Sequence, residues 1–124
     1  PHLVETTERF RVDGRDIDPS LFVKAEARVM DACAKEGIRL THFEALTLMA
    51  AWIFCSGEAI APVDVLLLEV GLGGLWDSTN AIPHSTCVIT PLALDHENLL
   101  GKGIVKVAEA KFGVVGAGNL VVHA

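Results

Sequence analysis

Clusters of basic residues are missing from this sequence, which has ten Lys and Arg against sixteen Asp and Glu and a net charge of -6. Surfaces that bind nucleic acid or anionic membranes need such clusters, so neither partner is expected. A membrane span is missing too, because the longest apolar run, residues 45–55, is about half the length that crosses a bilayer. Residues 1–10 lack the apolar core behind a basic start that marks a secretory signal.

Paired cysteines are also missing. Cys33, Cys55 and Cys87 are odd in number, widely spaced and set in apolar stretches, with no Cys-x-x-Cys pair. This pattern favours buried free thiols in a reducing cytosol, with a reactive thiol as the alternative. A cytoplasmic location is therefore expected.

The first half of the chain predicts a hairpin over residues 8–17 and helices over residues 21–35 and 43–54. Asp13-Gly14 is a strong signal for a tight turn. The first helix is expected to begin near Pro19 and to stop near Gly37. Thr41 caps the second helix, with Glu44 as its partner in a capping box. The second helix is apolar nearly all round, which is typical of the middle of a larger body.

Three apolar runs in the second half predict buried strands, at residues 63–70, 87–90 and 120–122. Because the runs are continuous rather than alternating, they are typical of a parallel sheet covered on both faces. A helix over about residues 103–111 separates the last two runs. The predicted fold class is α/β, with a mostly parallel sheet and flanking helices, and no internal repeat or Pro/Ser-rich linker is present.

Glu69 ends the first of these runs and is followed by the glycine-rich residues 71–74. Ligands in open α/β sheets lie beyond the carboxyl ends of the strands, and a carboxylate that ends a buried strand is costly unless it is paired. Glu69 is thus a candidate metal or substrate ligand, with a salt-bridged structural acid as the alternative. The glycine string lacks the spacing of a dinucleotide loop and the Lys-Ser/Thr of a P-loop.

Two further candidate sites lie after the second predicted strand and at the end of the last predicted helix. Asp95-His96 comes after the second strand, and an imidazole together with the carboxylate of Glu69 makes a partial cation site, although a structural histidine is the alternative. These two ligands alone do not single out Mg²⁺, which prefers oxygen. Lys111 ends the last predicted helix, where a cation that complements the helix C-terminus is the simpler interpretation.

Several motifs, in this order and spacing, resemble the folate branch of the Mur-ligase superfamily, the dihydrofolate synthase/folylpolyglutamate synthase family. They occupy residues 1–3 (the folate loop), 8–14, 40–44, 69–74 with 77–80, and 88–101. The resemblance runs nearly end to end. The combination of Glu-Val-Gly-Leu-Gly-Gly with Asp-x-Thr-Asn is highly specific and separates this branch from the cell-wall Mur enzymes.

The resemblance implies an ATP-dependent ligation of L-glutamate to dihydropteroate or a folate through an acyl phosphate, with Mg²⁺ at the phosphate oxygens. Glu69 and His96 match the family's metal ligands, and Lys111 matches a lysine that is carbamylated there; all three are predicted to be catalytic. A non-catalytic pterin-binding or interaction module is the alternative. The positions that match substrate-binding residues are His2, Leu3, Thr41, Phe43 and Asp77.

The resemblance also implies the central, P-loop-ATPase-like three-layer domain, of which residues 1–124 are a partial copy. The family's phosphate loop is expected before Pro1 and its C-terminal domain after Ala124. The chain alone is therefore expected to be inactive and to self-associate, whereas the whole ligase is expected to be a monomer. The departures from the family pattern are Leu75-Trp76 in place of Arg-Leu, Phe112 in place of a small residue, and Gly116-Ala117 in place of Lys-Pro.

Overall fold

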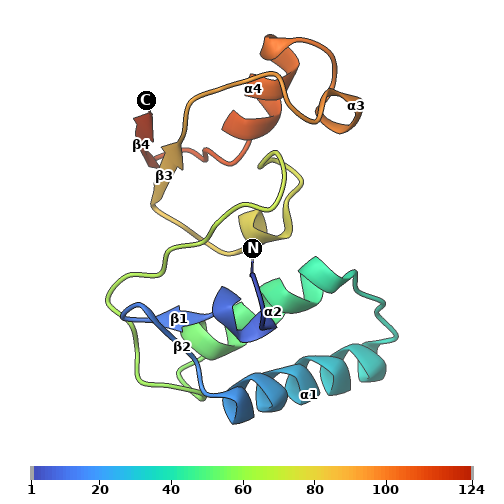
Figure 1. Cartoon of the computed structure of the whole chain (residues 1–124), viewed down its shortest axis with the longest axis vertical. Helices are drawn as coiled ribbons and strands as arrows, with labels where there is room; N and C mark the ends of the chain where they lie inside the picture. The colour runs from blue at the N-terminus through green and yellow to red at the C-terminus, as the bar shows by residue number, and fades with distance from the viewer. Residues whose placement is uncertain (1, 124) are drawn as a thin grey trace. The chain divides into compact units, whose positions relative to one another are not determined.

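The computed structural model describes residues 2–123 and divides the chain into two compact units, called here unit 1 (Pro1–Leu66) and unit 2 (Leu67–Ala124). Unit 1 contains a hairpin and two long helices, and unit 2 contains a pair of strands and two shorter α-helices (Figure 1). The single partial domain expected over residues 1–124 stays a prediction.

Unit 1 begins with three short elements, the 3-10 helix η1 (Thr6–Arg9) and the antiparallel strands β1 (Arg11–Val12) and β2 (Arg15–Asp16). Asp13 and Gly14 form the turn with φ values of 50° and 75°, in the left-handed region that an Asp-Gly turn accepts. Arg11 Nε lies 2.8 Å from Asp16 Oδ1 across the pair. The predicted hairpin is confirmed, except that residues 8 and 9 lie in η1.

Two helices follow, α1 (Pro19–Glu36) and α2 (His42–Cys55). The Asp18 carboxylate accepts the Ser20 N–H at 2.7 Å and caps α1, which ends at Gly37 with a left-handed φ of 65°. Thr41 and Glu44 form the capping box at the start of α2. Both predicted helices are confirmed. They could be predicted because their start and stop signals are local.

The core of unit 1 lies between α1, α2 and the hairpin. Phe10 packs edge-on against Phe22, with ring centroids 5.6 Å apart. Helix α2 buries mainly one face within the unit, and Leu48 on another face is 43% exposed. The buried apolar residues of this core are Phe10, Ile17, Ala25, Val29, Cys33, Leu46, Met49 and Ile53.

Unit 2 contains the elements η2 (Ser78–Ala81), β3 (Thr86–Ile89), α3 (Glu97–Leu100), α4 (Ile104–Phe112) and β4 (Leu120–His123). β3 and β4 pair in parallel, with Thr86 opposite Leu120 and Ile89 opposite His123. These two strands and the helix α4 confirm three predicted elements. Val88 is 62% exposed, so the pair buries mainly one face within the unit.

The strand predicted over residues 63–70 is wrong: the structure assigns these residues to no helix or strand. Val65 is 83% exposed and Leu67 is 86% exposed, in contrast to the buried run that was expected. A strand needs a neighbour to take its backbone hydrogen bonds, and the described part of the chain pairs no segment with this one. An apolar sequence without such a partner does not settle into a strand.

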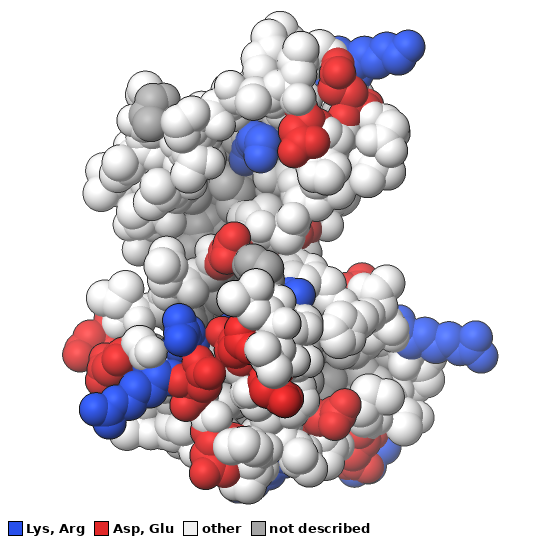
Figure 2. Space-filling view, in the orientation of Figure 1, with Lys and Arg blue, Asp and Glu red and all other residues white. Residues whose placement is uncertain are grey.

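The α/β class is confirmed, since helices accompany a parallel sheet. Within residues 2–123 this sheet has two strands, so the three expected layers are represented only in part. The described residues also contain no helix that is long and apolar enough to cross a membrane. In the view of Figure 2, Lys and Arg side chains are dispersed and gather into no single basic patch.

All three cysteines are free thiols. Cys33 and Cys87 are buried as predicted, but Cys55 is exposed. Cys55 is the last residue of α2, beyond Ile53, where the helix leaves the core. The prediction that all three thiols are buried was therefore wrong for Cys55.

Candidate functional site

The predicted site residues fall in both units. His2, Leu3, Thr41 and Phe43 belong to unit 1, whereas Glu69, Asp77, His96 and Lys111 belong to unit 2. These residues form two groups, one in each unit, and each group is called a half-site.

Residues 2–5, which contain the predicted substrate residues His2 and Leu3, are held by the first helical turn that follows them. The Glu8 carboxylate accepts the backbone N–H groups of Leu3, Val4 and Glu5 at 2.9, 2.9 and 2.7 Å. Arg9 Nε donates to His2 Nδ1 at 2.7 Å. The backbone donors of Glu5, Leu3 and Val4 lower the pKa of Glu8 from 4.5 to about 2. Sequence reasoning missed this role of Glu8, because it placed Glu8 in the first strand of the predicted hairpin.

Thr41 and Phe43 lie at the start of α2. The Thr41 hydroxyl donates to Glu44 Oε2 at 2.8 Å and accepts the Glu44 N–H at 3.3 Å, so it completes the capping box. The Thr41 N–H, which donates to Glu44 Oε2 at 2.7 Å, and the Thr41 hydroxyl lower the pKa of Glu44. Phe43 is half-buried, and its carbonyl oxygen accepts the Thr47 hydroxyl at 2.9 Å. The Thr41 hydroxyl therefore already has a structural role before any substrate is considered.

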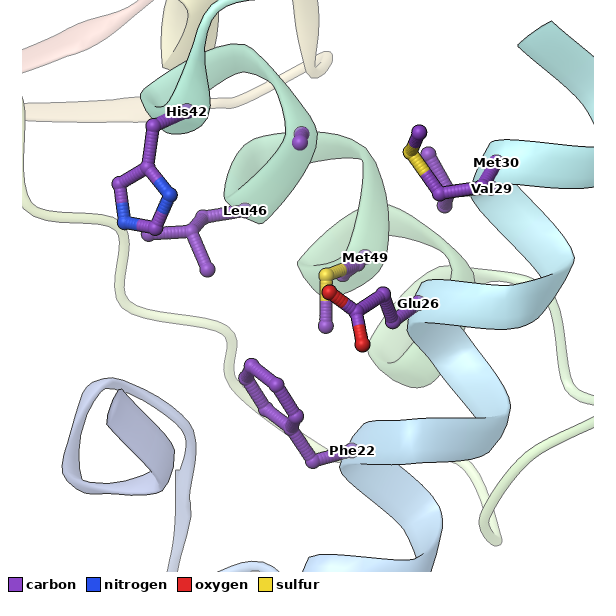
Figure 3. Close-up of a pocket in the computed structure, with 8 residues that line it drawn as sticks. Phe22, Glu26, Val29, Met30, His42, Leu46 and Met49 are labelled. Atoms are coloured by element: carbon purple, nitrogen blue, oxygen red, sulfur yellow. The ribbon is translucent and has the colours of Figure 1, made fainter. Parts of the chain in front are cut away.

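A small pocket opens between α1 and α2 beside this helix start (Figure 3). Its volume is about 60 Å³, and Phe22, Met30 and Met49 are among the side chains that line it. Such a volume has room for about two water molecules, far less than a bicyclic pterin ring requires. In this structure the pocket is a small gap in the packing of α1 against α2.

Asp77 closes the glycine-rich loop of unit 2. Its Oδ2 accepts the N–H groups of Gly71 and Leu72, both at 3.0 Å. Its Oδ1 accepts the Thr79 N–H at 3.0 Å and the Thr79 hydroxyl at 2.6 Å. Both carboxylate oxygens thus hold the loop in shape. The Asp-x-Thr spacing, which is typical of a capping turn, signals the two bonds with Thr79 but not the bonds that close the loop at Gly71 and Leu72.

The glycine-rich loop also packs against the C-terminal end of α4, where Lys111 lies. The Leu75 N–H donates to the Ala110 carbonyl oxygen at 3.0 Å. A Cβ atom on Gly74 would lie 2.7 Å from the Lys111 carbonyl oxygen, so only glycine permits this approach. Leu75 packs equally closely on Gly113. The structure thus brings the backbone of Lys111 against the loop that follows Glu69.

His96 has a left-handed backbone with φ of 53°, an uncommon conformation for a residue other than glycine. Its N–H donates to Asp95 Oδ1 at 2.8 Å, and its Nε2 lies 3.5 Å from Asp95 Oδ2. Strain of this kind persists where the surrounding structure fixes it, often at functional sites. The His96 side chain is 56% exposed, so it is open to a ligand.

Glu69 is exposed, which corrects the expectation that it ends a buried strand. The carboxylate of Glu69 therefore carries no cost of burial. A carboxylate and an imidazole are chemically suited to a divalent cation, but the described residues contain no cluster of three His, Cys, Asp or Glu that could hold one. The assignment of Glu69 and His96 as metal ligands stays a prediction.

Polar contacts hold the rest of unit 2 together. Asn119 Nδ2 donates to the His84 carbonyl oxygen at 2.7 Å, and its Oδ1 accepts the Gly116 N–H at 2.6 Å. Both ring nitrogens of His84 lie 2.9 Å from carbonyl oxygens, those of Ile82 and Val114. A protonated ring donates to both, so the carbonyls of Ile82 and Val114 raise the pKa of His84.

No family model matches the chain. The dihydrofolate synthase/folylpolyglutamate synthase of Escherichia coli is 40% identical over 114 residues, which cover 92% of this chain and 26% of the relative. The solved structure of E. coli FolC with DHPP and ADP has a TM-score of 0.87 and 32% identity, and the match covers 99% of this chain and 34% of that one.

A bifunctional folylpolyglutamate synthase/dihydrofolate synthase with Mn, AMPPNP and L-glutamate bound has a TM-score of 0.84 and 35% identity, with 99% of this chain and 29% of that chain covered. The fold is therefore that of an α/β segment of a synthase. More particularly, the chain matches dihydrofolate synthase/folylpolyglutamate synthases along nearly its whole length, and the resemblance seen in the motifs is confirmed. It spans about a quarter of the length of the curated relatives that it matches first.

Proposed function

We propose that this chain is the folate-binding and cation-binding segment of an ATP-dependent ligase that joins L-glutamate to dihydropteroate or a folate. One observation carries the proposal: 99% of the chain superposes on synthases that were solved with DHPP and ADP, or with Mn, AMPPNP and L-glutamate. The loop that Asp77 closes has the most specific motif of the chain, so the chemistry is proposed to lie there.

The proposed reaction has two steps. An oxygen of the substrate carboxylate attacks the γ-phosphorus of ATP, which forms an acyl phosphate and releases ADP. The amine nitrogen of L-glutamate then attacks the acyl carbon, a proton leaves the nitrogen, and inorganic phosphate departs. The chemistry is mostly positioning and charge stabilisation, which a rigid loop next to a helix end can provide.

Each half-site is proposed to have its own task. In unit 2, Glu69 and His96 would supply two ligands to Mg²⁺, and the ion would neutralise charge on the phosphate oxygens. Lys111, as an amine or a carbamate, would lie beside them at the end of α4. In unit 1, Leu3 and Phe43 offer apolar contacts to the pterin and benzoyl rings. The remaining proposed substrate-binding residues are His2, Thr41 and Asp77.

Residues 1–124 are proposed to form part of the central domain of the ligase. The phosphate loop and the glutamate-ligase domain would come from other segments, and the chain alone would release no ADP. The proposed location is the cytoplasm, where the free thiols of Cys33, Cys55 and Cys87 stay reduced.

A hybrid enzyme tests this proposal. The segment of the E. coli synthase that matches this chain is replaced by residues 1–124, and ADP release is measured with Mg-ATP, dihydropteroate and L-glutamate, each omitted in turn. We expect release that needs all three substrates. Glu69→Gln and His96→Ala should each lower this release by about 100-fold or more, because each removes a group that stabilises charge.

Glu36→Gln is the matched control for Glu69→Gln, since Glu36 is an exposed acid at the far end of α1. Its hybrid should release ADP at the rate of the unchanged hybrid. A folded hybrid that binds dihydropteroate but releases no ADP would contradict the ligase and favour the non-catalytic binding module.

A further inference from the structure

The carboxylate of Glu8 binds backbone N–H groups in the segment of residues 2–5, as a bound anion would. It accepts the consecutive N–H groups of Leu3, Val4 and Glu5 within 2.7–2.9 Å, and Glu8 belongs to the helical turn that directly follows. The neighbouring Arg9 holds His2 at 2.7 Å. Two adjacent charged residues therefore fix four consecutive positions.

This arrangement limits what the segment can offer to a ligand. Three successive backbone N–H groups could otherwise bind a carboxylate or a phosphate, but Glu8 already occupies them. Leu3 is 96% exposed and Val4 is 81% exposed. Leu3 and Val4 thus present apolar side chains on a backbone whose donors are satisfied, between the exposed polar side chains of His2 and Glu5. These two residues are therefore suited to contact an apolar or aromatic surface.

Rigid presentation matters because a flexible segment has to lose conformational entropy when it binds. Residues 2–5 contain no helix or strand. Apart from the Glu8 N–H, which donates to the Glu5 carbonyl oxygen at 3.1 Å, the hydrogen bonds described above that hold them in place come from the side chains of Glu8 and Arg9 in η1. Without Glu8, three backbone donors would be released to water, and Leu3 would sample many positions.

We propose that Glu8 is a positioning residue that pre-orders residues 2–5 and presents Leu3 and Val4 to the ring part of the substrate, rather than to its carboxylates. This inference rests on the proposed function. Glu8 itself touches no substrate; it acts through the backbone of the segment.

The test uses the hybrid enzyme with Glu8→Ala. The KM for dihydropteroate should rise about tenfold, with kcat within about twofold of the unchanged hybrid, because pre-ordering affects binding and not the chemical step. The KM for a monoglutamylated folate should rise by a similar factor, since both substrates share the rings. The KM values for ATP and L-glutamate should stay unchanged.

Two further variants sharpen the result. Glu8→Gln keeps one acceptor oxygen and should give a smaller rise in KM, whereas Glu36→Ala should give none. Amide hydrogen exchange at Leu3, Val4 and Glu5 should accelerate in Glu8→Ala and not in Glu36→Ala, which reports the order of the segment without any turnover.

The outcomes separate the two proposals. If the unchanged hybrid shows no substrate-dependent ADP release, the proposed function fails and the inference falls with it. If the unchanged hybrid is active but Glu8→Ala leaves the KM for dihydropteroate as it was, the inference alone is overturned. Equal rises in the KM values for dihydropteroate, ATP and L-glutamate would also overturn it, because they would indicate a general loss of structure.

Discussion

Unit 1 and unit 2 are each stabilised internally by a different kind of interaction. Unit 1 has a continuous apolar core between two capped helices and a hairpin. In unit 2, the buried apolar side chains are only Cys87, Ile89 and Val107 among the described residues. Unit 2 relies instead on polar side chains that bind backbone groups, chiefly those of Asp77, His84 and Asn119.

The two kinds of interaction differ in how strongly they fix a conformation. Apolar burial is strong and insensitive to exact geometry, whereas a side chain that binds several backbone groups fixes a loop in one conformation. The motif with the most specific sequence, at residues 69–80, lies in the unit that uses polar contacts. Such loops open more readily than a packed core, which suits residues that have to receive a ligand.

The largest expected effect is on the core of unit 1. Ile53 is fully buried, so Ile53→Ala leaves a cavity and should lower the free energy of unfolding by about 3 kcal/mol. Urea denaturation followed by circular dichroism measures this loss. Val23→Ala, at a position on α1 that is 61% exposed, is the control and should cost less than about 0.5 kcal/mol. Equal losses for both variants would contradict the existence of a tight core.

A somewhat smaller effect is expected in unit 2. Asp77→Ala removes the acceptor for the N–H groups of Gly71, Leu72 and Thr79 and should cost about 2 kcal/mol. Amide hydrogen exchange at Gly71 and Leu72 should accelerate, while exchange in α1 stays slow. Asp77→Asn keeps one acceptor oxygen, so its loss of stability should be smaller than that of Asp77→Ala. Uniform acceleration across both units would show that they are not independent.

The smallest effect is a difference in pH dependence. His84 has a raised pKa, so its contribution to stability is complete below pH 6.5 and is lost as the pH rises through the raised value. In unit 1, the pKa values of Glu8, Asp18 and Glu44 are lowered by hydrogen bonds from neighbouring residues. Their contribution is present above pH 4.5 and is lost as the pH falls below it.

Mild alkali should therefore loosen unit 2, and acid should loosen unit 1. Hydrogen exchange followed from pH 6 to pH 8.5, corrected for its intrinsic rate, should show a growing loss of protection at residues 114–120 and none in α1. His84→Gln should remove this trend. A trend that persists in His84→Gln would assign it to another group.

Local signals in the sequence predicted most of unit 1. Asp18, Gly37 and the pair Thr41 and Glu44 set the helix ends through contacts within a few residues, so no knowledge of the fold was needed. The strand expected at residues 63–70 was wrong because a strand depends on a distant partner that hydrophobicity does not reveal.

The sequence identified candidate site residues, but it did not predict the contacts that they make. Glu69, His96 and Lys111 were chosen by motif, and their roles stay predictions. The loop-closing role of Asp77 and the anion role of Glu8 depend on backbone N–H groups, which every residue has and which no motif marks. Hydrogen bonds between side chains and the backbone are therefore the part of the candidate site that could not be predicted from the sequence.

The parallel pairing of β3 and β4 has a consequence for how the chain acquires its structure. Thr86 meets Leu120 only after both α3 and α4 have been accommodated between them, whereas β1 meets β2 across a two-residue turn and α1 is followed closely by α2. Closing a longer stretch of chain costs more entropy before any contact rewards it, and folding rates fall as contacts become more distant in sequence. We therefore expect the helices of unit 1 to form first during refolding, and the strand pair of unit 2 to form last.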